Sequence, residues 1–91
     1  MNEITIKRNP SEELLNKMGA FTWPIWEKET SEFPWYYDTE ETCYLLEGEV
    51  VVTPANGEPV RFGAGDLVTF PAGLSCVWKI SADVRKHYHF S

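Results

Sequence analysis

Apolar and polar residues alternate along most of the chain, in short segments that Gly, Pro, Asn and Asp separate. Ile4 and Ile6 alternate with polar neighbours in residues 2–8, which predicts a short strand. From Ala20 onward the pattern is almost entirely that of strands, and the longest apolar stretch runs from Thr42 to Thr53. Seven or eight short strands at this spacing predict an all-β sandwich or barrel.

A single helix signal interrupts the strand pattern near the N-terminus. Ser11 can cap a helix with an acidic first turn, and Gly19 can end it. Between them, Leu14, Leu15 and Met18 form a small apolar face. The helix has about two turns and is too short to be stable alone, so we expect it to lie against a sheet edge.

Turn signals divide the second half of the chain at short intervals. Asn56 and Gly57 predict a hairpin with a type I′ turn, because both residues tolerate the positive φ angles that this turn requires. Turns are also expected at residues 63–66 and at residues 71–73. Ser81, Ala82 and Asp83 are expected to separate the last two strands.

Size, composition and charge narrow the class of protein. A chain of 91 residues makes one domain. The net charge of −6 repels a polyanion, so we expect no nucleic acid partner. Without a signal peptide or a stretch of ~20 apolar residues, we expect a cytoplasmic protein with no membrane partner. Cys43 and Cys76 are therefore expected to be reduced thiols.

Two motifs connect these turns to a known family. The first is Glu41 followed by six residues and Gly48 (ETCYLLEG); the second runs from Gly65 and Asp66 through residues 71–73 to Cys76. Together they resemble the two motifs of the cupin superfamily, over about residues 34–80. The chain looks most similar to small one-domain cupins grouped with the ureidoglycine aminohydrolase domains. The resemblance implies a cupin-type (jelly-roll) β-barrel forming a single domain, 1–91, with the N-terminal strand and short helix in 1–20 and the barrel in 21–90.

The resemblance also indicates where the usual cupin metal ligands would lie. A typical metal-binding cupin supplies His-x-His and Glu from its first motif and another His from its second. Here the Glu is Glu41, but Trp35 and Tyr37 stand at the paired histidines and Cys76 stands at the third. A stable divalent site needs three or four protein ligands, so we expect no metal cofactor.

The same positions predict a pocket. Side chains two residues apart share a strand face, so an inward Glu41 brings Cys43 with it, and Cys76 brings Trp78. An inward carboxylate in apolar surroundings needs a partner or a proton. The predicted ligand-binding residues are Trp35, Tyr37, Glu41, Cys43, Cys76 and Trp78.

Three functions are compatible with such a pocket. The first is a binding module for a small polar or aromatic molecule. The second, implied by the resemblance, is an enzyme acting on a ureido or amide compound, with Glu41 as acid/base and Cys76 or Tyr37 assisting. The third is a structural or partner-binding protein whose barrel is filled by its own side chains.

Two further features leave alternatives open. His87 and His89 face the same way on a strand and can bind metal, although no third ligand is obvious; the other interpretation is satisfied surface or core histidines. Exposed edge strands and surface aromatics, among them Trp23, Trp26 and Phe33, favour a homodimer.

Overall fold

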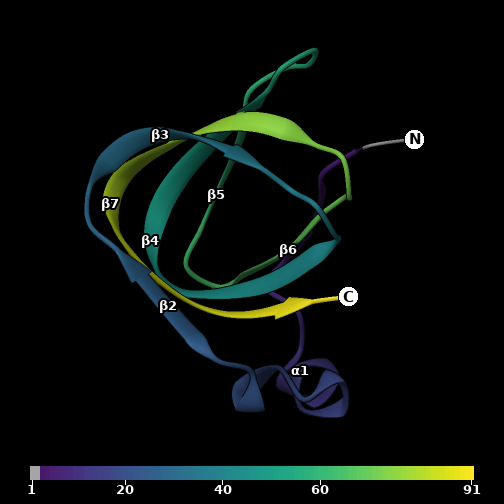
Figure 1. Cartoon of the computed structure of the whole chain (residues 1–91). Coiled ribbons are helices and arrows are strands. Elements are labelled where there is room, and N and C mark those ends of the chain that lie inside the picture. Colours follow the sequence, from purple (N-terminus) through teal and green to yellow (C-terminus); the bar gives the residue numbers. More distant parts are fainter. Residues whose placement is uncertain (1–2) are drawn as a thin grey trace.

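In the computed structural model, residues 3–91 form one seven-stranded sheet, a short α-helix and a 3-10 turn (Figure 1). Mostly β structure with one short helix agrees with the predicted fold class. In chain order the elements are β1 (Thr5–Arg8), α1 (Glu12–Met18), η1 (Ala20–Thr22), β2 (Ile25–Lys28), β3 (Ser31–Tyr36), β4 (Glu41–Pro54), β5 (Val60–Gly63), β6 (Asp66–Phe70) and β7 (Ser75–Phe90).

The two longest strands, β4 and β7, organise the sheet. All pairings are antiparallel, in the order β1-β6-β4-β7-β2, with β3 added to β7 and β5 added to β4. Figure 1 shows both long strands bending around a common interior. Side chains on their concave faces therefore meet, although the residues are far apart in sequence.

The predicted N-terminal elements are confirmed. The strand expected over residues 2–8 is β1, which pairs with β6, and residue 2 lies outside the described residues. Helix α1 is capped by the Ser11 hydroxyl, which accepts a hydrogen bond from the Leu14 amide at 3.1 Å. It ends at Gly19 in the left-handed conformation, φ 76°. Figure 1 shows α1 lying outside the curved sheet.

The predicted break at residues 81–83 is wrong, because β7 continues from Ser75 to Phe90. Its pairing with β4 is nevertheless irregular there: the register shifts three times between Leu45 and Val50, and at two of these shifts the extra residue lies in β7, between Ile80 and Arg85. Gly48 lies within this stretch with φ 118°, and a Cβ there would come within 2.9 Å of the Asp83 carbonyl oxygen. Glycine therefore lets β4 pass close to β7 where the pairing is bulged.

The turn expected at Asn56 and Gly57 is present but is not type I′. The Gly57 amide donates to the Pro54 carbonyl at 3.3 Å, which closes a turn over residues 54–57. Neither Asn56 nor Gly57 is among the residues with positive φ, whereas a type I′ turn requires positive φ at both of its central residues. The hairpin position was predicted correctly and its turn type was not.

The core lies on the concave side of the sheet. Alternation along β4 buries Glu41, Cys43 and Leu45 and leaves the residues between them partly exposed. Tyr37 and Phe70 stack at 4.7 Å between ring centroids, and Trp78 packs beside Phe70 at 5.6 Å. This aromatic cluster fills much of the interior. Within residues 3–91 we find no helix with the length and apolar character of a membrane span.

Candidate functional site

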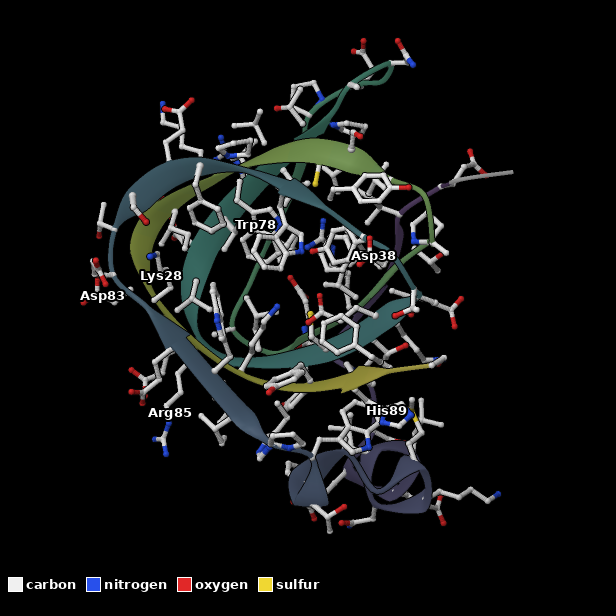
Figure 2. The ribbon with its side chains drawn as sticks, viewed as in Figure 1. Lys28, Asp38, Trp78, Asp83, Arg85 and His89 are labelled. Carbon is white, nitrogen blue, oxygen red and sulfur yellow. The ribbon has the colours of Figure 1, made fainter. Side chains whose placement is uncertain are left out.

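An aromatic pocket opens beside this cluster, with a volume of about 160 Å³. The exposed fractions of Trp35 and Phe90 are 46% and 47%, so these two side chains stand where the pocket meets solvent. Figure 2 shows Trp78 pointing into the interior of the curved sheet. The pocket walls are the rings of Trp26, Phe33, Trp35, Trp78, Tyr88 and Phe90, and Tyr37, Glu41 and Lys86 add polar groups.

The polar end of the pocket is a buried ion pair. Lys86 on β7 donates from Nζ to Oε2 of Glu41 on β4 at 2.9 Å, and the two side chains are only 5% and 4% exposed. A buried charge is costly unless it is paired, so Lys86 is the partner that an inward Glu41 requires.

Two tryptophan rings complete the surroundings of the ammonium group. The Nζ atom of Lys86 lies 4.9 Å from the ring centroid of Trp26 and 4.7 Å from that of Trp78. The faces of indole rings carry negative electrostatic potential and attract cations. Lys86 is therefore held by one carboxylate and two ring faces.

Tyr37 supplies a neutral hydroxyl beside the ion pair. Its oxygen accepts a hydrogen bond from the Trp78 ring N–H at 3.1 Å. Burial, and to a lesser degree the charge of Glu41, raises the pKa of Tyr37 far above its usual value. Tyr37 therefore keeps its proton at neutral pH and can act as a hydrogen-bond donor.

The two cysteines are buried free thiols and are not among the lining residues of the pocket. Burial raises the pKa of Cys43 to about 12 and that of Cys76 to about 11. The Cys76 thiol also contacts the backbone carbonyl of Trp35, at 3.6 Å. A catalytic role for Cys76 stays a prediction, and a thiol that holds its proton at neutral pH does not favour it.

Four of the six predicted ligand-binding residues line the pocket: Trp35, Tyr37, Glu41 and Trp78. Sequence reasoning missed Lys86, Tyr88 and Phe90, although two-residue alternation places all three on one face of β7. It also described Trp26 and Phe33 only as surface aromatics, whereas both residues are partly buried and line the pocket.

The histidines occupy the other face of β7. His87 Nδ1 lies 2.8 Å from the backbone carbonyl of Trp23, and the His89 ring stacks on the Trp23 ring with centroids 5.4 Å apart. Figure 2 shows His89 on the side of the strand that faces α1. These contacts agree with the interpretation as satisfied histidines packed against the 3-10 turn.

The donor groups near Glu41 do not fit the usual cupin metal. In the part of the chain that the structure describes, no three His, Cys, Asp or Glu side chains come close enough together to hold a metal ion. Glu41 is paired with an ammonium group, and Cys76 contacts a backbone carbonyl. One carboxylate and one protonated thiol fall short of the ligand number that a divalent ion needs.

The comparison with known proteins agrees with this fold. Residues 15–88 match the family described as the EutQ-like cupin domain. The chain belongs to this family. It is also similar to the crystal structure of a DUF861 family protein from Thermotoga maritima, with 54% identity and a TM-score of 0.94, over 98% of this chain and 100% of that one. No curated protein matches it significantly.

Longer EutQ proteins contain a similar domain. This EutQ-like cupin is 30% identical to a putative ethanolamine utilization protein Q from Salmonella typhimurium, with a TM-score of 0.66, over 72% of this chain and 53% of that one. A second EutQ protein, from Clostridium difficile, is 21% identical with a TM-score of 0.65, over 72% and 52% of the two chains, and indicates the fold alone. The chain thus spans about half the length of these EutQ proteins. The narrower likeness to ureidoglycine aminohydrolase domains stays a prediction.

Proposed function

We propose that this EutQ-like cupin binds a small molecule in the aromatic pocket, against the Glu41–Lys86 pair. We further propose that its strands close into the jelly-roll barrel that the cupin resemblance implies, as a single domain. Trp35 and Phe90 then stand at the mouth of the barrel. This proposal does not include ethanolamine utilization, which the name of the longer Salmonella typhimurium protein gives for a chain about twice this length.

The observation that carries this proposal is an ion pair buried beside an open cavity. A barrel filled for stability alone has no need of two buried charges, because apolar residues of similar volume are often as stabilising. Here Glu41 and Lys86 border a space of about 160 Å³ between aromatic rings. Small-molecule sites combine apolar walls with a few fixed polar groups in this way.

The polar groups also indicate what the pocket accepts. The charges of Glu41 and Lys86 cancel, so a neutral ligand leaves the pair intact. Lys86 donates to Oε2 of Glu41, and no described group donates to the other oxygen, Oε1. No described side-chain oxygen is both fully buried and unpaired, so Oε1 keeps some contact with solvent, and Glu41 lines the pocket. We infer a small, flat, uncharged molecule with a hydrogen-bond donor at one end.

An NMR fragment screen tests this proposal when it is combined with alanine variants of two neighbouring residues, Trp35 and Tyr36. Trp35 lines the pocket, whereas Tyr36, the next residue along β3, is 56% exposed and does not line it. Small planar amides, phenols and heterocycles are expected to shift the indole N–H signals of Trp26 and Trp78. Trp35→Ala should weaken binding of the hits at least ~10-fold, the loss of ~1.4 kcal/mol of stacking, and Tyr36→Ala should leave it unchanged.

Two results would contradict the proposal. One is a screen in which no fragment perturbs the pocket signals, as the filled barrel predicts. The other is a set of hits that bind both alanine variants with equal affinity, which would place the binding site elsewhere.

A further inference from the structure

The Lys86 ammonium group is enclosed by side chains from three strands. Glu41 comes from β4, Trp26 from β2 and Trp78 from β7, and Trp26 pairs directly with Lys86 across the two strands. The Lys86 Nζ atom lies 2.9 Å from Glu41 Oε2, 4.9 Å from the Trp26 ring centroid and 4.7 Å from the Trp78 ring centroid. The whole residue is only 4% exposed.

This arrangement suits an ammonium ion. A lysine ammonium is a compact, strongly hydrated charge with three N–H donors, so it is buried only where other groups replace its water. Here one carboxylate oxygen accepts a hydrogen bond and two ring faces approach the rest of the charge. Such an arrangement gains strength in a site that excludes water.

The same arrangement is a poor site for a divalent metal. Ring faces attract a cation but offer no lone pair for coordination, and only the Glu41 carboxylate is a metal ligand among the three enclosing groups. By the cupin resemblance, position 41 holds the carboxylate that meets the metal in the family. In this chain that carboxylate meets an ammonium group instead.

We propose that Glu41, Trp26 and Trp78 form a primary-ammonium site, which Lys86 fills as the resident cation in the place of a cupin metal. The fold thus keeps a positive charge on the carboxylate of its first motif but supplies it from its own chain. This inference depends on the enclosure of Lys86 and not on the identity of the pocket ligand, so it can hold even if the fragment screen fails.

Chemical rescue tests the site directly. Lys86→Ala removes three methylene groups and the ammonium, which together correspond to n-propylammonium. Propylammonium chloride is expected to raise the Tm of Lys86→Ala by several degrees. Equal concentrations of 1-propanol and sodium chloride control for apolar filling and for ionic strength, and neither should do the same. Wild type and Lys79→Ala, which alters an exposed lysine on the same strand, should not respond.

Two further variants test whether propylammonium stabilises Lys86→Ala by binding beside Glu41. Glu41→Gln combined with Lys86→Ala should lose the rescue, because the anionic partner is gone. Lys86→Met should also not respond, because its side chain fills the space without a charge. If propylammonium fails to stabilise Lys86→Ala, or stabilises the variant with Glu41→Gln equally, the ammonium site is refuted.

Two measurements on the wild type apply even if Lys86→Ala does not fold. The Cε protons of Lys86 should be shifted upfield by the indole rings relative to those of Lys79, and an unshifted signal would refute the enclosure. After dialysis against Zn²⁺, elemental analysis should show no stoichiometric metal. Stoichiometric zinc that is lost in Glu41→Gln would mean that a metal, and not Lys86, is the cation of this site.

Discussion

Two successive residues of β7 form ion pairs on opposite faces of the strand. Arg85 meets Glu27 at 3.3 Å on the outer face, where the two side chains are 49% and 68% exposed. Lys86 meets Glu41 at 2.9 Å on the inner face, where the side chains are 5% and 4% exposed. Figure 2 shows Arg85 pointing away from the interior into which Trp78 points.

The two ion pairs show how burial changes the contribution of the same kind of contact to stability. An exposed pair exchanges water for a partner with little net gain, typically 0–1 kcal/mol. A buried pair gains little over apolar packing, yet each charge strongly requires the other. Arg85–Glu27 is therefore dispensable, whereas Lys86 and Glu41 must be kept or lost together. This interdependence supports reading the inner face as the functional one.

Removing one charge from each pair should produce the largest contrast. Lys86→Met leaves Glu41 buried without its partner and should lower the free energy of unfolding by about 3–5 kcal/mol. Arg85→Met on the outer face should lower it by about 1 kcal/mol or less. Urea unfolding at pH 7, followed by tryptophan fluorescence, measures both.

The double variant Glu41→Gln/Lys86→Met sharpens this test. It removes both charges and should recover much of the stability lost in Lys86→Met, since no uncompensated charge remains. Equal losses in Lys86→Met and Arg85→Met would show that water reaches the inner pair, and the contrast between the faces would disappear.

The overall fold was predictable because its signals are local. Ser11 and Gly19 mark the ends of α1, and alternation around Glu41 identifies the inner face of β4. The break expected at residues 81–83 was wrong for a non-local reason. Polar residues there resemble a turn, but β7 keeps its pairing with β4 through register shifts that place extra residues in β7 close to Gly48.

The candidate site was predictable only in part because it depends on pairing between strands. The cupin resemblance indicated Trp35, Tyr37 and Glu41 as site residues, and all three line the pocket. The need of Glu41 for a partner was also evident from the sequence. The partner is Lys86, which the β4–β7 pairing sets opposite Leu45 on the same buried face as Glu41, and no sequence pattern indicates a contact between residues 45 positions apart.

Burial of Cys43 on the inner face should also make stability fall at alkaline pH. Burial raises the pKa of Cys43 from 9.0 to about 12. Below pH 9 the thiol is protonated in both the folded and the unfolded chain. Between pH 9 and 12 the unfolded chain releases this proton and the folded chain keeps it, so the free energy of unfolding should fall by up to about 1.4 kcal/mol per pH unit.

Cys43→Ala isolates this contribution. Unfolding in urea at pH 8, 9 and 10 should give a steeper decline for wild type than for Cys43→Ala, because only wild type carries this thiol. Parallel declines would mean that the Cys43 thiol ionises as readily in the folded chain as in the unfolded one. Water would then reach Cys43 more readily than its burial indicates.

The smallest effect concerns the outer pair and its dependence on salt. A double-mutant cycle of Arg85→Gln and Glu27→Gln should give a coupling of about 0.2–1 kcal/mol at low ionic strength. In 1 M sodium chloride the Debye length is only about 3 Å, so this coupling should approach zero.

The same cycle with Glu41→Gln and Lys86→Met should keep its larger coupling in both conditions, because buried charges are screened much less. If salt abolished both couplings, ions would reach Lys86 and the ammonium would not be enclosed by Glu41, Trp26 and Trp78. If the coupling energy persists in 1 M salt only for Lys86 and Glu41, the two ion pairs differ because solvent reaches Arg85 and does not reach Lys86.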